Sequence, residues 1–302
     1  MAFNAPINYD ENFKETVERV LKLIELKYID NIEKGILKRW LKNFTTPEEK
    51  YFATLILTKL IYRSEKAILS MFQNIIELVL PELLTKLNIY EVPSLKEWKK
   101  GLITPITIQT LPFCISTVTG VDNNIGKSGE DLNRLLKEKQ IIYKSINLNL
   151  IHSKPIPKKL NTIILIDDIA GTGKQFEKFY NKYKDRLEHF QHIIYVPLVA
   201  YYESIDFIED LDDRIHMHPL ETLDSEKVFL SDSTEKFDGQ NTYQDLNTFY
   251  HDLLANKGIS FSAKQQHYSK NTLYIFKISS PNTNLPLIYH EDDSWNKLFT
   301  RF

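Results

Sequence analysis

The spacing of apolar side chains in the first part of the chain is that of consecutive amphipathic helices. Val17, Val20 and Ile24 recur at three- and four-residue intervals, which places them on one helical face. The same spacing continues through residues 32–41 and 52–61. We therefore predict a small all-α domain over residues 1–95.

A strong helix start within this region is found at Thr46. Pro47 follows at the first helical position, and Glu49 is placed to close a capping box with the threonine hydroxyl. Pro81 is expected to end or kink a later helix, because proline lacks the amide proton that a helix interior requires. Short helices of this kind suit a packing and interaction domain, or a winged-helix module whose recognition helix reads DNA.

Beyond residue 95 the pattern changes to short apolar runs that alternate with helical stretches. Near-continuous apolar strands, each followed by a helix, are typical of a mostly parallel sheet covered by helices on both faces. We therefore predict an α/β domain over residues 96–302. The expected strands are residues 103–110, 163–166 and 192–201, and the expected helices are residues 130–139, 174–183 and 243–254.

Composition fits this division and limits the class of protein. The 302 residues are 42% apolar and 26% charged, which provides a continuous core without metal or disulfide. The single cysteine, Cys114, lies between Phe113 and Ile115 and is expected to be a buried, unreactive thiol. One cysteine and a start without the features of a signal peptide predict a cytoplasmic protein.

Charge gives little guidance about partners. The formal net charge is −2, so there is no general argument for nucleic-acid binding. Lys38 and Arg39 belong to a basic cluster that alone supports the DNA-binding interpretation, whereas residues 203–252 are rich in Asp and Glu.

The most informative passage follows the apolar run at residues 163–166. Two adjacent acids, Asp167 and Asp168, come directly after the run, and a small flexible turn and an amphipathic helix come next. Ligands of α/β sheets bind at the carboxyl ends of strands, and glycines let backbone amides at a helix start approach a phosphate. Adjacent carboxylates can accept hydrogen bonds from the two hydroxyls of a ribose. The residues expected to bind the phosphate are Gly171, Thr172, Gly173, Lys174 and Gln175.

Two other interpretations of this passage compete with a ribose-phosphate site. A P-loop would require a glycine where Asp168 stands and a serine or threonine where Gln175 stands, so the pattern fits it poorly. A purely structural strand-to-helix turn would leave the acid pair and the glycines without a ligand to explain them.

A second glycine-flanked helix start lies at residues 126–129. Lys127 and Ser128 would hold another anion there, such as a departing pyrophosphate. Ser128 is equally suited to be an ordinary helix N-cap.

The turn resembles the phosphoribosyl pyrophosphate (PRPP) signature of type I phosphoribosyltransferases. That resemblance implies that Asp167 and Asp168 hold the ribose as catalytic residues and as ligands of Mg²⁺, while the turn holds the 5′-phosphate. Two positions depart from the pattern. Gly171 stands where a hydroxyl residue is usual, and Gln175 replaces a terminal threonine, which affects turnover more than binding.

The order of motifs along the whole chain is similar to a phosphoribosyltransferase-like family of bacterial conflict systems. The motifs are the helical front, residues 126–129, the acid pair with its turn, and a tail over residues 280–301. The resemblance implies a type I phosphoribosyltransferase-like fold and an effector of antiviral defence, in retron-type cassettes among others. It also implies PRPP with Mg²⁺ as substrate, and partner subunits such as a reverse transcriptase with its RNA–DNA. The alternative is a non-catalytic subunit that senses a nucleotide or assembles the complex.

The histidines offer weaker candidates. His216 and His218 lie two apart in a probable strand, but no third ligand at suitable spacing supports a metal site. His251 and His290 are candidates for a general base only if the fold brings them to the acid pair.

Overall fold

The protein folds as two compact units. The computed structural model describes residues 3–118, 128–139, 141–142, 155–225, 228–231, 241–261, 269–278 and 280–300. The terminal unit joins Met1–Lys66 with Leu223–Phe302, and the sheet unit is Ala67–Thr222. This division differs from the predicted domains 1–95 and 96–302, because the first helices pack with the last segment of the chain rather than with the helices that follow them.

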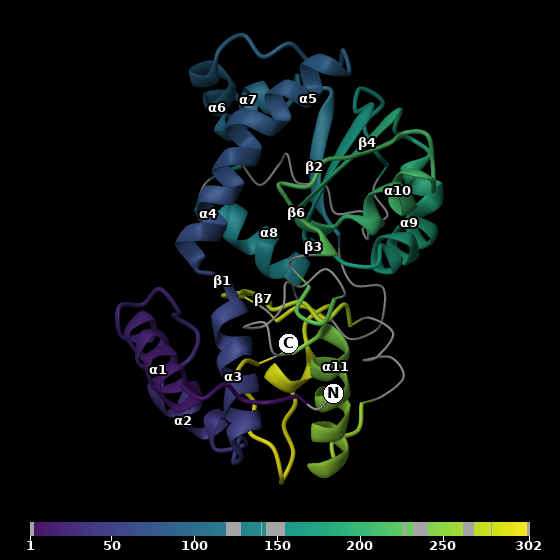
Figure 1. Ribbon diagram of the computed structural model, residues 1–302. Coiled ribbons are helices and arrows are strands. Elements are labelled where there is room, and N and C mark those ends of the chain that lie inside the picture. Colours follow the sequence, from purple (N-terminus) through teal and green to yellow (C-terminus); the bar gives the residue numbers. More distant parts are fainter. Residues whose placement is uncertain are drawn as a thin grey trace. The chain divides into compact units, whose positions relative to one another are not determined.

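The sheet unit contains the parallel sheet, with helices α9 and α10 on one side and α4 and α8 on the other (Figure 1). Its boundaries fall within α4 and β6. The helical elements are α4 (Glu65–Asn74), the π-helix η1 (Ile75–Val79), α5 (Leu80–Lys86), α6 (Leu95–Ile103), α7 (Pro105–Ile108), α8 (Ser128–Glu138), α9 (Lys174–Leu187) and α10 (Glu203–Glu209). The strands are β2 (Phe113–Thr117), β3 (Thr162–Ala170), β4 (His192–Tyr201), β5 (Ile215–Met217) and β6 (Glu221–Leu223).

The strand order β2–β3–β4–β5 places β3 inside the sheet, with parallel pairing at each of these contacts, and β6 also pairs with β4. All of β2 and nearly all of β3 and β4 are buried, as expected for a sheet covered on both faces. The predicted α/β class, with a mostly parallel sheet flanked by helices and a helical region before it, is therefore confirmed.

One expected strand is wrong. Residues 103–110 contain the end of α6 and the short helix α7, and the first strand of the sheet is β2 instead. Pro105 begins α7, where a missing amide proton costs nothing, and this outweighs the β-branched composition of the segment. Cys114 in β2 is buried as predicted, and burial raises the pKa of its thiol to about 12.

The run Glu65–Lys86, which comprises α4, η1 and α5, is long and apolar enough to cross a membrane by length and composition. Phe72, Ile75 and Leu80 are nevertheless fully buried in this fold. The indole of Trp98 on α6 also donates a hydrogen bond to the carbonyl of Ile76, at 2.7 Å. These contacts are those of a core helix.

The terminal unit is built from both ends of the chain. Its elements are α1 (Tyr9–Glu25), α2 (Lys34–Leu41), α3 (Pro47–Lys59), β1 (Ile61–Arg63), α11 (Tyr243–Asn256), β7 (Tyr274–Phe276) and the 3₁₀-helix η3 (Pro286–Ile288). The predicted capping box at Thr46 is present, since the threonine hydroxyl accepts from the Glu49 amide and the Glu49 carboxylate accepts from the Thr46 amide.

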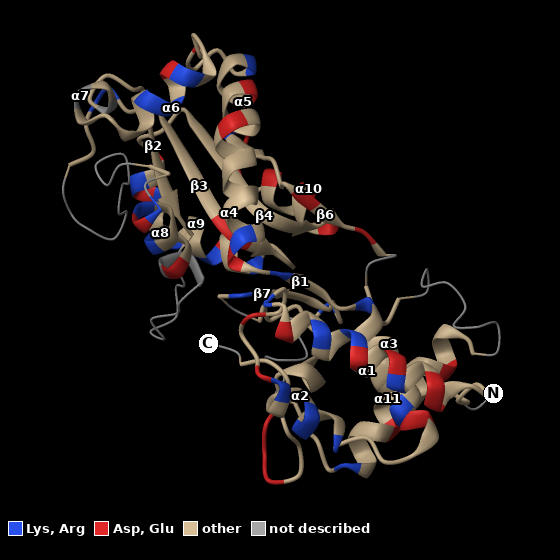
Figure 2. Ribbon diagram, turned by 90° about the vertical axis from the view of Figure 1, so that its left-hand side faces the viewer, with Lys and Arg blue, Asp and Glu red and all other residues tan. Residues whose placement is uncertain are grey.

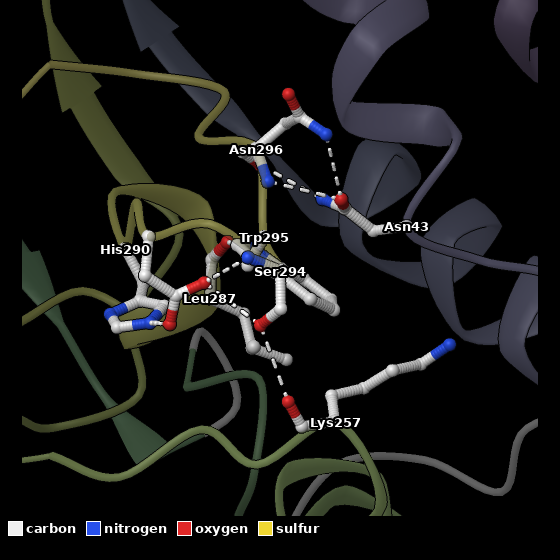
Figure 3. A network of polar contacts seen from close by, with 8 residues as sticks. Asn43, Lys257, Leu287, His290, Ser294, Trp295 and Asn296 are labelled. Carbon is white, nitrogen blue, oxygen red and sulfur yellow. Dashed lines mark hydrogen bonds and ion pairs between the residues drawn. The ribbon is translucent and has the colours of Figure 1, made fainter.

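Two indoles and one amide side chain join the ends of this unit. Trp40 on α2 and Trp295 near the C-terminus both donate to the carbonyl oxygen of Leu287, at 3.3 and 3.0 Å. Figure 3 shows the neighbouring contact, in which the Asn43 side chain donates to the Asn296 carbonyl at 2.8 Å and accepts from the Asn296 amide at 3.0 Å. The tail that carried the family resemblance is thus part of the core of the terminal unit.

The described part of the terminal unit offers neither an exposed recognition face on α3 nor a wing formed by β1. A recognition helix needs an exposed face, but from Tyr51 to Leu57 every residue of α3 is buried or half-buried. Strand β1 pairs in parallel with β7, so it forms no hairpin wing. Lys38 and Arg39 are exposed on α2, whose basic residues are coloured in Figure 2, but α2 has only eight residues.

The turn between β3 and α9 is fixed by Gly173. Its φ of +75° lies in the left-handed region, and a Cβ added there would lie 2.4 Å from the ring of Phe207 on α10. No residue other than glycine meets both constraints without strain.

We predict that Gly173→Ala lowers the free energy of unfolding by about 2–4 kcal/mol, because left-handed strain and overpacking against Phe207 add. Gly258→Ala is the control, since Gly258 has φ +67° with no neighbour within 4 Å. It should cost only about 1–2 kcal/mol. Urea unfolding followed by circular dichroism measures both. Adding Phe207→Ala to Gly173→Ala should recover part of the loss; equal losses in the two glycine variants would contradict the role of Phe207.

Candidate active site

The acid pair lies inside a strand rather than after it. We expected the strand to end before the acids, yet β3 continues to Ala170, with Asp167 opposite Pro197 and Ala170 opposite Ala200 on β4. Ile169 and Ala170 extend the apolar β pattern past the acids, and both pair with β4 in the same register, Ile169 opposite Val199. The acids are therefore held by the sheet, and the turn begins at Gly171.

Asp167 is bonded within the core. Its exposed fraction is 1%, and its two oxygens accept hydrogen bonds from the Tyr195 hydroxyl at 2.9 Å and from the Asp168 amide at 3.0 Å. The Tyr195 ring in turn packs against Phe176 of α9, with centroids 4.2 Å apart. Strand β4 and helix α9 together fix the position of this carboxyl group.

The pKa of Asp167 lies well above its ordinary value. Burial is the largest cause, followed by the charge of Asp168 and a hydrogen bond with the Asp168 side chain. Two carboxyl groups this close cannot both ionise cheaply, so they share a proton. Asp167 is therefore the member of the pair whose protonated form the fold favours.

Asp168 is 4% exposed, and one of its oxygens accepts from the Ile169 amide at 2.9 Å. It is the better candidate acceptor for a sugar hydroxyl, because burial raises the pKa of its neighbour Asp167 and favours the protonated form there. It is also the better ligand for a cation than Asp167, whose proton and two accepted hydrogen bonds leave it poorly suited to hold Mg²⁺. In the described residues no three His, Cys, Asp or Glu side chains come together as a metal site. A magnesium ion here would take most of its ligands from phosphate and water.

The turn presents backbone rather than side chains. Gly171 and Thr172 are half-buried, Gly173 is buried, and α9 begins at Lys174 without a side-chain cap for its first amides. Thr172 Oγ1 accepts only a long hydrogen bond from the Lys174 amide, at 3.4 Å. The amide groups of this turn can therefore receive an anion, which the positive end of the helix dipole favours.

Lys174 is already engaged. Its ammonium group lies 3.1 Å from a carboxylate oxygen of Glu177 and 4.3 Å from the centre of the Phe207 ring. The lysine thus connects α9 to α10 instead of extending over the turn, while the neighbouring Gln175 is exposed.

The second proposed anion site, at residues 126–129, lies largely outside the described residues. Lys127 lies outside the described residues, and Ser128 begins α8 with its side chain likewise undescribed. Its role stays a prediction.

The predicted histidine pair is replaced by a different one. His216 lies in β5, but its ring nitrogen is 3.3 Å from that of His192 on β4, whereas His218 follows the strand. Burial lowers the pKa of His216, and the neighbouring His192 adds to this effect. His251 and His290 belong to the terminal unit, and His290 bonds Asp292 at 2.7 Å (Figure 3).

Three residues that the sequence did not single out shape this site: Tyr195, Ser204 and Phe207. The Ser204 hydroxyl contacts the carbonyls of both Ala170 and Tyr201, at 3.0 and 2.7 Å, and so joins the ends of β3 and β4. A tyrosine inside the apolar run of β4 was an available signal, because a buried hydroxyl usually needs a partner.

We predict that Asp167→Asn becomes increasingly more stable than the wild type as pH rises. The folded-state pKa of Asp167 lies above its ordinary value of 3.8, so the folded protein binds the extra proton and loses stability as pH rises from about 4. Asparagine is neutral throughout. The gain should reach at most about 1.4 kcal/mol per pH unit until the folded-state pKa is passed.

Urea unfolding between pH 4 and 9 measures this difference. Asp185→Asn, which changes an exposed acid on α9, is the matched control and should show an offset that does not vary with pH. A pH-independent offset for Asp167→Asn as well would contradict the shared proton.

The family comparison agrees with this geometry. The model of the PRTase-CE family, where PRTase stands for phosphoribosyltransferase, matches residues 37–301, which is most of the chain and includes both acids and the turn. No curated protein matches the chain. The fold places an acid pair in an inner strand of a parallel sheet, with a glycine turn directly after that strand. Since the family model also matches over this length, the chain belongs to the PRTase-CE family and is phosphoribosyltransferase-like.

Proposed function

We propose that this protein binds PRPP, or a related ribose-phosphate nucleotide, and acts at C1 of the ribose. The observation that carries the proposal is the placement of the acid pair at the carboxyl end of β3, with only Ile169 and Ala170 between it and the Gly171–Thr172–Gly173 turn. A ribose 5-phosphate requires these two kinds of group side by side: donors for its phosphate and acceptors for its hydroxyls.

Each group has a distinct task in this proposal. The backbone amides from Gly171 to Gln175 would receive the 5′-phosphate. Asp168 would accept from a ribose hydroxyl, while Asp167 accepts a hydrogen bond from the Tyr195 hydroxyl. Since both acids are nearly fully buried, sugar binding requires the groups that cover Asp168 to move aside.

The chemistry would be the loss of pyrophosphate from C1. The C1–O bond breaks, its electron pair leaves with pyrophosphate, and the sugar becomes oxocarbenium-like before an acceptor adds. The negative charge of Asp168 stabilises that positive centre in a poorly solvated site. Mg²⁺, which the family resemblance implies, would supply charge neutralisation of the pyrophosphate.

We predict that Asp168→Asn weakens PRPP binding about 10- to 150-fold, the value of a hydrogen bond to a charged group. Calorimetry with PRPP and Mg²⁺ measures binding, and release of pyrophosphate measures turnover. Asp185→Asn is the control and should leave both unchanged. Equal binding by the wild type and Asp168→Asn would overturn the proposed role of Asp168, and no binding by the wild type would overturn the function.

A second function, a non-catalytic sensor of a nucleotide, is favoured by two positions of the turn. Gly171 and Gln175 stand where hydroxyl-bearing residues are expected, so fewer donors surround the phosphate. The same experiment separates the two functions, because a sensor binds its ligand without releasing pyrophosphate.

The biological role that we propose is an effector of antiviral defence, restrained by other subunits of a defence system. It is supported by the resemblance in motif order to phosphoribosyltransferase-like proteins of bacterial conflict systems. A reverse transcriptase with its RNA–DNA product is one partner type that the resemblance implies. Plating phage on cells that express the complete locus tests this role: Asp168→Asn should abolish protection, and undiminished protection would separate defence from the acid pair.

A further inference from the structure

Two histidine rings meet on the sheet, at the end of β4 that lies away from the candidate active site, and the proposed function does not use them. His192 is the first residue of β4, and His216 is the middle residue of β5. The Nδ1 atom of His192 lies 3.3 Å from the Nε2 atom of His216. Both side chains are half-buried, so solvent reaches the pair.

The strand register holds the two rings in place. Ile194 pairs with His216, so His192 lies two positions earlier on the same face of the sheet. Diagonal neighbours of this kind are about 7–8 Å apart, which is within reach of ring side chains. The two nitrogens are therefore presented by the backbone of adjacent paired strands rather than by loops.

The separation of the two nitrogens suits a tetrahedral metal ion. Zinc binds histidine nitrogen at about 2.0–2.1 Å, and two ligands at the tetrahedral angle are then about 3.3–3.4 Å apart. The observed 3.3 Å meets this requirement, whereas it is long for a hydrogen bond between the rings. An ion requires both lone pairs to turn away from the line that joins the nitrogens, while the distance between them stays the same.

The local charge also favours a cation. The Glu209 carboxylate on α10 accepts from the amide of Met217 at 2.9 Å, next to His216 in the strand. Burial is the main cause of the lowered pKa of His216, the neighbouring His192 adds to it, and Glu209 opposes it. The His216 ring is therefore neutral near pH 7, which is the form that binds metals, and Glu209 supplies negative charge close by.

We propose that His192 and His216 together bind a divalent metal ion that prefers nitrogen ligands, with Zn²⁺ as the representative. Imidazole suits Zn²⁺, Ni²⁺ and Cu²⁺, while Mg²⁺ prefers oxygen ligands. In the part of the chain that the structure describes, no third His, Cys, Asp or Glu side chain joins the pair, so water completes the coordination. The ion links β4 to β5, a strand of only three residues that is last in the order β2–β3–β4–β5.

This inference does not rest on the proposed function. Asp167 pairs with Pro197, five positions along β4 from His192, so at about 3.3 Å per residue the two sites are roughly 16 Å apart along the strand. A metal ion on the histidine pair thus cannot contact a sugar held by the acid pair. Because the paired strands exist only in the folded protein, the ion stabilises the folded state.

Calorimetric titration of the full-length protein, freed of any affinity tag, with Zn²⁺ tests the inference, with excess Mg²⁺ as a competitor. His192→Ala and His216→Ala each remove one ring, and His216→Gln can keep a hydrogen bond to His192 but is a poor zinc ligand. His218→Ala removes an exposed histidine just beyond β5 and is the matched control. Electron paramagnetic resonance with Cu²⁺ in place of Zn²⁺ detects nitrogen ligands directly.

We expect the wild type to bind one Zn²⁺ per chain, unaffected by Mg²⁺, and to unfold at a higher temperature when Zn²⁺ is present. Each substitution of His192 or His216 should weaken binding at least about tenfold, because loss of a group that merely supports a metal ligand already costs about 10- to 100-fold. His218→Ala should behave like the wild type. Circular dichroism without metal confirms that each variant is folded.

Three results would each overturn the inference. They are a wild type that binds no Zn²⁺, binding that persists unchanged without either ring, and a Cu²⁺ spectrum without nitrogen ligands. Equal weakening by His218→Ala would assign the metal to scattered surface histidines and overturn the paired site as well. None of these results bears on PRPP binding, which Asp168→Asn tests separately.

Discussion

The hydrogen bond from Tyr195 to Asp167 is the interaction on which the candidate site depends. It joins β4 to β3 beneath the turn and gives a buried carboxyl group a partner. Without that donor, one buried oxygen of Asp167 would lose its hydrogen bond, which costs about 1–3 kcal/mol. With it, the carboxyl group of Asp167 is fixed beside Asp168 at the carboxyl end of an inner strand.

The region around this bond is built to hold the backbone in place. Ser204 joins the ends of β3 and β4, and Phe207 covers Gly173, so α10 acts as the outer support of the turn. Lys174 takes part in the same support through Glu177 and Phe207. The chemistry proposed for the turn therefore relies on backbone amides and one carboxylate, with few side chains directed at the phosphate.

Much of this arrangement could be predicted from the sequence because it depends on local pattern. The apolar runs of β3 and β4, the capping box at Thr46 and the glycine turn are each specified by neighbouring residues. The failures involve contacts distant in sequence. The residues 103–110 were expected to form a strand from composition alone, and the predicted boundary at residue 95 missed the bonds from Trp40 and Trp295 to Leu287. The burial of the acids was missed for the same reason, since only the strand register brings Tyr195 to Asp167.

The terminal unit contains both ends of the chain, and this determines when it can fold during synthesis on the ribosome. The sheet unit is complete once residue 222 has emerged, whereas α2 cannot make its indole bond until Leu287 is available. Domains generally fold as units as the chain is made, and contacts of large sequence separation form slowly. The turn between β3 and α9 should thus form on the nascent chain before the first helices can pack against the C-terminal segment.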